Sequence, residues 1–184
     1  MKNKSSLWIC LLIGIVVVSC DKKPSLQSYY VDKMDDSSFL IVNLPLQLDS
    51  LFSDDLSSKE QQALNSIDKL NLLFFRSKKD QEEKYQNELT KISTILSQDK
   101  YQPLMDFKSF DKAQGSFLFE GDTDKVEEGI IFLNSAKMGF GVLRIIGSDM
   151  DPGVIMSLAK KANPDQMKKQ FGSSVGVSFY CSYS

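Results

Sequence analysis

Apolar and polar residues alternate along this chain in a pattern that predicts short strands separated by amphipathic helices. The strand-like runs are rich in β-branched and aromatic residues and are bounded by polar residues, glycine or proline. They are Phe39–Leu44, Leu70–Phe75, Tyr101–Phe107, Phe117–Phe119, Ile130–Leu133 and Phe140–Ile146. Short polar links join the last four runs. We therefore expect antiparallel neighbours there, because a parallel crossover needs about a dozen residues or more.

Helical spacing marks several segments between and after these runs. Ser57 and Glu60 form a capping box at the start of one helix, and Ser77 or Asp80 offers a cap for the longest one. Asp151 caps a third helix, because the proline that follows it suits the first helical position. The apolar positions of these helices are Ala63, Leu64 and Ile67, then Tyr85, Leu89, Ile92 and Leu96, then Ile155, Leu158 and Ala159, with a further helical turn at Pro45–Phe52 and a short last helix at Asn163–Gly172.

These elements predict a single α+β domain at residues 28–172. We expect an antiparallel or mixed sheet with helices packed mainly on one face. Residues 173–184 form an aromatic tail without charge, which either packs on the sheet or offers an edge to a partner. We favour packing, with residues 175–180 as an edge strand or a loose segment.

The beginning of the chain carries an export signal. Two lysines precede an apolar run at Leu7–Val18, which has the length of a signal-peptide core and is too short for a comfortable membrane span. At its end, Val17–Cys20 resembles the lipobox of bacterial lipoproteins. We therefore predict a lipoprotein signal peptide at residues 1–19 and a lipidated N-terminus with a short tether at residues 20–27. An ordinary secretory signal and a retained membrane anchor are the alternatives.

Cys20 is the predicted site of lipid attachment, palmitate included, and the signal would be cut between Ser19 and Cys20. Cleavage beside a small residue suits Ser19, whereas Cys10 follows two bulky residues. Two or three acyl chains would make the attachment effectively permanent, because each buried methylene contributes about 0.8 kcal/mol. Cys181 is then the remaining thiol of the processed chain, so no intramolecular disulfide can form.

Composition and charge exclude several classes of function. The chain contains no histidine, which removes serine–histidine–aspartate triads, cysteine–histidine dyads and zinc sites that need imidazole. The formal net charge is −2, or about −4 without the two lysines of the signal, and no basic stripe indicates nucleic-acid binding. Gly139, Gly141 and Gly147 lack the dinucleotide-binding spacing and favour a hairpin with close backbone approach.

Acidic residues are the remaining candidates for chemistry. Asp122–Asp124, followed by two glutamates, lacks the central glycine and the terminal glutamate of a calcium loop, so we favour a solvated turn. Asp149 and Asp151 could form a carboxylate pair, but Asp151 is already explained as a helix cap. We therefore predict no catalytic residue, no metal site and no cofactor.

The lipobox is followed by strand and helix segments in a distinctive order. They are Phe39–Leu44, Leu70–Phe75, Ile92–Leu96, Tyr101–Met105 and Gly139–Gly147. In this order the chain resembles domain-of-unknown-function family 4252, whose members are mostly lipoproteins or exported proteins of Bacteroidota. The resemblance covers about residues 28–165. It implies a small envelope domain with no established activity and no functional residue to carry over.

We predict a lipid-anchored cell-envelope protein that is noncatalytic, attached to the membrane by its N-terminal lipid, and active in protein interaction or envelope support. An envelope protein is the expected partner. The alternative is a histidine-independent hydrolase or a small-ligand-binding lipoprotein, which would need a pocket with converging polar groups. The residues after Cys20 lack an acidic, lysine-led string, so we expect the periplasmic face of the outer membrane. The inner membrane and the cell surface are the alternatives.

Overall fold

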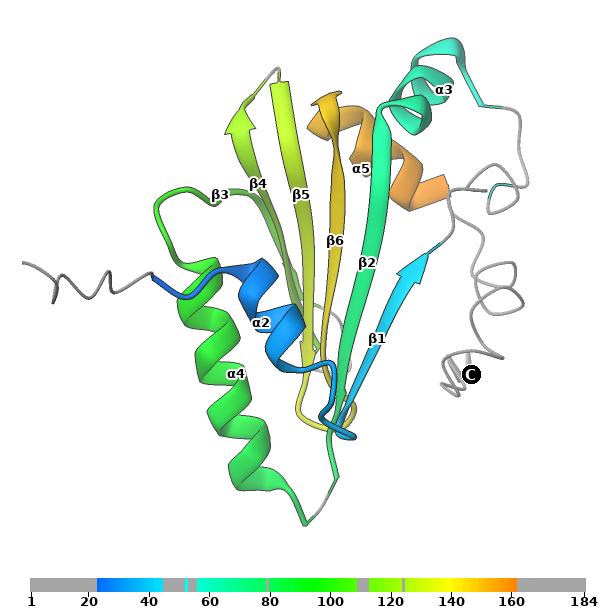
Figure 1. Ribbon diagram of the computed structural model, residues 1–184. Coiled ribbons are helices and arrows are strands. Elements are labelled where there is room, and N and C mark those ends of the chain that lie inside the picture. Colours follow the sequence, from blue (N-terminus) through cyan, green and yellow to red (C-terminus); the bar gives the residue numbers. More distant parts are fainter. Residues whose placement is uncertain are drawn as a thin grey trace, which may run out of the picture.

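The computed structural model describes residues 23–44, 52, 56–78, 80–108, 113–123 and 125–161. Within these ranges the strands form a six-stranded sheet in the order β1-β2-β6-β5-β4-β3, and every neighbouring pair is antiparallel (Figure 1). The α+β class is therefore confirmed. The elements are α2 (Leu26–Asp32), β1 (Phe39–Leu44), α3 (Ser58–Asn65), β2 (Ile67–Arg76), α4 (Glu82–Leu96), β3 (Gln102–Lys108), β4 (Gln114–Asp122), β5 (Lys125–Ser135), β6 (Gly139–Met150) and α5 (Pro152–Lys161).

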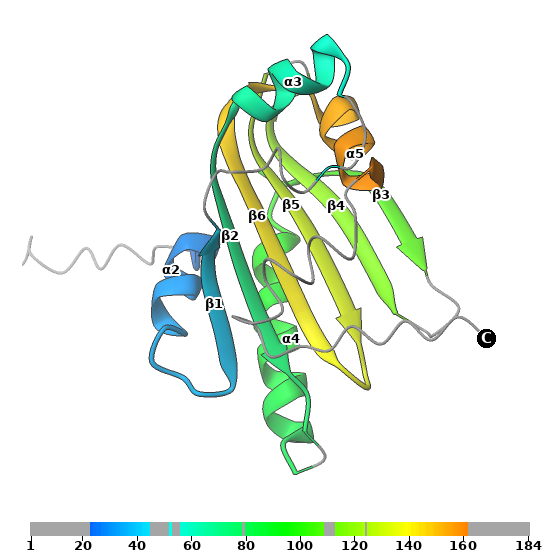
Figure 2. The same ribbon diagram turned by 90° about the vertical axis from the view of Figure 1, so that its right-hand side faces the viewer.

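Helices lie on both faces of the sheet (Figure 2). On the first face, α2 and α4 pack over the middle strands, and Tyr29 and Ile92 are buried with Phe140 of β6. On the second face, α3 and α5 pack at one end, where Leu64 and Ile155 join a separate buried cluster. The expected packing of helices mainly on one face is not confirmed. Both sets of alternating side chains on the central strands are apolar, so both faces need cover.

An aromatic cluster fills the core beneath α2 and α4. Phe140 is fully buried, and its ring stacks on Phe75 of β2 with centroids 5.3 Å apart. Phe39 of β1 meets Phe75 edge-on at 5.0 Å. Tyr85 of α4 lies 6.1 Å from Phe75 by ring centroids. Offset and edge-to-face pairs of this kind each add about 0.5–1.5 kcal/mol beyond the burial of area, so the cluster joins β1, β2, β6 and α4.

Helix α2 has no counterpart among the elements that the sequence predicts. It begins at Leu26, inside the segment assigned to the tether, and Leu26 is almost fully buried. Ser25 caps the helix by accepting a hydrogen bond from the backbone N–H of Ser28 at 3.1 Å. Tyr30 fixes the helix to the sheet, because its hydroxyl donates to the backbone carbonyl of Val142 at 2.8 Å. The folded domain therefore begins closer to Cys20 than expected.

The other predicted boundaries are shifted by a few residues. The capping box at Ser57 and the cap at Asp151 are confirmed. Ile67 belongs to β2 rather than to the preceding helix, because the chain turns into the sheet after Ser66. Gln81, not Ser77 or Asp80, is the N-cap of α4, without a side-chain hydrogen bond.

Strands β4 to β6 contain the predicted runs and extend beyond them, whereas β3 begins at Gln102, one residue after the predicted start at Tyr101. The predicted helical turn at residues 45–52 lies outside the described residues except for Phe52, which forms a β-bridge, and the short helix at residues 163–172 and the tail at residues 173–184 lie outside them entirely. None of the described helices is long and apolar enough to span a membrane.

Candidate interaction surface on the sheet

The second face of the sheet carries two uninterrupted apolar rows, the first at the margin of the end that α3 and α5 cover and the second beyond it. Residues paired across antiparallel strands point to the same face, so the strand register places one side chain or glycine from each strand in each row. We call these two rows together the open face. The first row is Val42, Leu72, Leu143, Ile131, Phe117 and Met105, and the second is Leu40, Phe74, Gly141, Leu133, Gly115 and Phe107. No polar residue interrupts either row.

Much of this apolar surface is accessible. Leu133 is 47% exposed, Met105 38% and Phe107 36%. In the first row, Leu72 and Leu143 are partly buried, and Phe117 is almost fully buried in the cluster with α5. Among the described residues, no helix lies over the second row (Figure 2). Large contiguous apolar surfaces on folded domains mark sites of interaction.

Glycine lets the second row pack closely at the β3 side of the sheet. A Cβ atom on Gly115 would overlap the Phe107 ring, and it would approach Leu133 Cδ2 to 2.9 Å. The aromatic ring therefore lies directly over the glycine backbone. A larger residue at position 115 would displace this ring, so the glycine is needed for the packing of the second row at β3 and β4.

The first face of the sheet, under α2 and α4, holds a network of charged groups that fastens α2. Glu88 of α4 accepts hydrogen bonds from Tyr29 at 2.9 Å, Lys33 at 3.2 Å and Lys91 at 2.7 Å. Burial opposes ionisation of Glu88, but these three donors outweigh it and lower the pKa of its carboxyl. Burial and the bond to Glu88 raise the pKa of Tyr29, which keeps the phenol protonated. This network joins α2 to α4 and leaves no group poised as a nucleophile or base.

A second ion pair on this face has the same role. Arg144 of β6 donates to both carboxylate oxygens of Glu128 on β5, at 2.7 and 3.1 Å, and also to Gln27 of α2. Burial opposes ionisation of Arg144, but Glu128 raises its pKa. A bidentate pair with its donors satisfied fixes orientation rather than supplying a reactive group.

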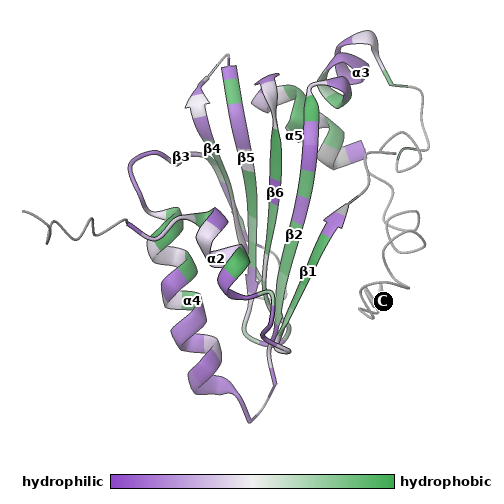
Figure 3. Cartoon of the chain, viewed as in Figure 1, coloured by the Kyte–Doolittle hydropathy of each residue, from purple (hydrophilic) through white to green (hydrophobic). Residues whose placement is uncertain are grey.

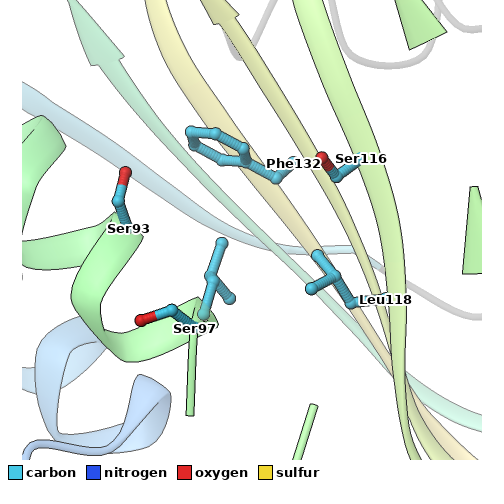
Figure 4. A pocket seen from close by; sticks show the side chains of 6 residues that line it. Ser93, Ser97, Ser116, Leu118 and Phe132 are labelled. Carbon is cyan, nitrogen blue, oxygen red and sulfur yellow. The ribbon is translucent and has the colours of Figure 1, made fainter. Parts of the chain in front are cut away.

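A shallow hollow of about 210 Å³ lies between α4 and strands β4 and β5 (Figure 4). Its lining residues are Ser93, Leu96, Ser97, Ser116, Leu118 and Phe132. Ser116 donates a hydrogen bond to Asp106 at 2.6 Å. The lining offers hydroxyls and apolar surface, and none of these six residues is ionisable. Such a hollow could hold a small, partly apolar molecule but provides no acid or base of its own.

The predicted site residues have different outcomes. Ser19, Cys20 and Cys181 lie outside the described residues. Asp151 is a helix cap, because its carboxylate accepts from the backbone N–H groups of Gly153 at 2.8 Å and Val154 at 3.1 Å. Of the acidic stretch predicted as a solvated turn, Asp122 ends β4 and Glu128 lies in β5, buried and paired with Arg144, whereas Asp124 is outside the described residues. Among the described residues, no group of three or more histidine, cysteine, aspartate or glutamate side chains is arranged to hold a metal ion.

The open face was not recognised in the sequence, although one signal for it is present. In an antiparallel sheet with one solvated face, apolar and polar residues alternate. This alternation is largely absent from three predicted strands, where the residues that point to either face are mostly apolar. These strands are Leu70–Phe75, Ile130–Leu133 and Phe140–Ile146. Figure 3 shows this as mostly hydrophobic colouring along β1, β2 and β6, in contrast to the hydrophilic N-terminal half of α4.

Comparison with known families gives one match. The family model of a domain of unknown function (DUF4252) matches residues 29–158 of this chain. Because the match spans more than half of the sequence, the chain belongs to this family. No curated protein matches the chain, and no solved structure matches it.

Proposed function

We propose that this DUF4252 chain is a lipid-anchored, noncatalytic cell-envelope module that binds a protein partner through the open face. The observation that carries the proposal is the pair of apolar rows, which cross all six strands without a polar residue. Leu133 and Met105 present accessible apolar surface at this face. Burial of such surface contributes about 25 cal/mol per Å², so an apolar partner segment would gain affinity here.

The lipobox supports the anchored location. Cys20 lies five residues before Ser25, the N-cap of α2, and five extended residues span at most about 18 Å. A lipidated Cys20 would therefore hold α2 close to the bilayer. We place the protein on the periplasmic side of the outer membrane, with the inner membrane and the cell surface as alternatives, in a member of Bacteroidota.

Anchoring is tested by metabolic labelling with a fatty-acid probe. We expect the native chain to take up the label and to fractionate with membranes. Cys20→Ser should abolish both, whereas Cys10→Ser should change neither, because Cys10 lies inside the signal core. Labelling of the Cys20→Ser variant at the native level would refute the lipobox interpretation.

Partner binding is tested in cells with a photoreactive amino acid at position 133 of the open face. The matched control carries it at Ser93, which is exposed on α4 on the opposite side of the sheet. We expect a discrete adduct with an envelope protein from position 133 and not from position 93. Equal adduct patterns from both positions would contradict partner binding at the open face.

The hollow beside Phe132 supports a second candidate function, the binding of a small, partly apolar ligand. The hydroxyls of Ser93, Ser97 and Ser116 would give such a ligand polar contacts. The lining offers no acid or base, so the hollow favours binding over histidine-independent hydrolysis. Native mass spectrometry of the protein purified from its own membranes would reveal a bound molecule, and Ser116→Phe should remove it. Retention of the molecule by that variant would place it elsewhere.

A further inference from the structure

We infer that the C-terminal segment Phe171–Ser184 covers the open face in the free protein. Helix α5 ends at Lys161, and its residues Ile155 and Leu158 are buried in one cluster with Phe117 of the first apolar row. The chain therefore leaves α5 on the side of the sheet that carries the open face (Figure 2). Twenty-three residues follow Lys161, and they need only a short path to reach the rows.

The composition of the segment suits an apolar surface. Phe171–Ser184 contains no charged residue. A charge placed against the rows would lose its hydration without gaining a partner, so the absence of charge removes this cost. Apolar side chains also recur at every second position, the period at which one side of an extended chain faces one surface. These positions are Val175, Val177, Phe179, Cys181 and Tyr183.

The length of the segment also fits. In extended form, Val175–Tyr183 spans about 26 Å at about 3.3 Å per residue. Six strands spaced about 4.8 Å apart are about 24 Å wide from the first to the last. The alternating residues are thus long enough to follow one row from edge to edge. Residues 162–170 can span about 30 Å, which lets the segment start at either edge of the sheet.

This inference deepens the proposed function, because a covered face must be uncovered before a partner can bind. The rows and the segment support the cover by themselves. Only its displacement by a partner rests on the proposed function. A segment of this kind would hide the apolar rows until a partner with a better-matched apolar strip displaces it. A second copy of this chain is the competing occupant.

Cross-linking in the full chain tests the cover. Cys10→Ser and Cys20→Ser leave Cys181 as the one native thiol. A second cysteine is introduced as Leu133→Cys on the open face or, as the matched control, as Ser93→Cys on the opposite face, and a short bismaleimide is added to monomeric protein. We expect several-fold more intramolecular product with Leu133→Cys than with Ser93→Cys. Phe179→Asp should reduce that product toward the control level.

Two results would overturn the inference. Equal product from the two positions would show that the segment has no preference for the open face. Product that links two chains would assign the face to a second copy. The photoreactive experiment at position 133 tests the proposed partner binding separately from the cover. If the intramolecular product is absent while the adduct at position 133 forms, the cover is refuted and partner binding is supported. If the intramolecular product forms and the adduct does not, the cover is supported and partner binding is refuted.

Discussion

Gly139 is the position where a single added methyl group should cost the most. It begins β6 directly after the β5–β6 turn with φ at +110°, a conformation that side chains rarely adopt. A Cβ atom there would lie 1.9 Å from the backbone carbonyl oxygen of Phe75 and 2.8 Å from the backbone nitrogen of Ser77. Both obstacles belong to the backbone, so no rotation of a side chain relieves them. The end of β2 is held in place, because the N–H of Ser77 donates to the carbonyl of Met138 at 3.0 Å.

The cost of Gly139→Ala can be estimated from these contacts. Holding alanine at this positive φ costs about 1–3 kcal/mol. Relief of the contact with Phe75 requires the hairpin to move by about 1 Å, and loss of the Ser77 hydrogen bond costs about 1 kcal/mol more. We therefore expect a loss of about 2–4 kcal/mol in the free energy of unfolding. Domains of this size have about 5–15 kcal/mol in total, so the variant should be severely weakened.

Gly141 is the matched control, two residues along the same strand. A Cβ atom on Gly141 would lie 3.4 Å from Phe74 Cδ2 and 3.8 Å from the carbonyl oxygen of Leu73, which are close to ordinary contacts. Gly141→Ala should therefore be neutral or stabilise the fold by about 0.5–1 kcal/mol, because alanine restricts the unfolded chain. Urea unfolding followed by far-UV circular dichroism measures both variants. Shifts of equal size and sign for the two glycines would refute the backbone reasoning.

Two further predictions concern the core and the link between α3 and α5. Phe140→Ala should lower the free energy of unfolding by about 3–5 kcal/mol, whereas Leu133→Ala, at a residue 47% exposed, should cost less than about 1 kcal/mol in the same urea assay. Hydrogen bonds from Lys161 and then Ser57 lower the pKa of Glu60 from 4.5 to about 2. Stability from this carboxylate is complete above pH 4.5 and is lost as the pH falls toward 2, so Glu60→Gln should flatten the pH dependence of the urea midpoint in that window. An unchanged pH dependence would contradict the link.

Local chemistry explains which parts of the fold could be predicted from the sequence. The cap at Ser57 and the cap at Asp151 depend on residues within a few positions of each other, and both were found. The hairpin at Gly139 was found because glycine beside strand-like runs indicates a turn with close backbone approach, and its φ is positive. Helix α2 was missed, since its short apolar pattern and its cap at Ser25 resemble a polar tether. Its stability comes from contacts with β6 and α4 that are far away in the sequence.

The candidate surface depends on strand order and register, which local patterns do not encode. Leu72 and Leu143 lie side by side only because β2 pairs with β6, across a long intervening segment. The buried carboxylate of Glu88 likewise accepts hydrogen bonds from residues of α2 and its C-cap as well as from α4. A charged residue on an amphipathic helix is normally solvated, so its sequence position gave no sign of this role.

The apolar rows of the open face are not needed to set the register of the sheet. A slip of one residue would move Phe140 and Phe75 out of the aromatic core. The face covered by α2 and α4 therefore already fixes the register of strand pairing. Polar residues in place of the exposed Leu133 and Met105 would then have been compatible with the same fold, as on the solvated face of ordinary antiparallel sheets. Their apolar character exposes the protein to aggregation unless something covers it. The rows are therefore best explained by a cover that the protein uses, first its own uncharged C-terminal segment and then a partner that replaces it.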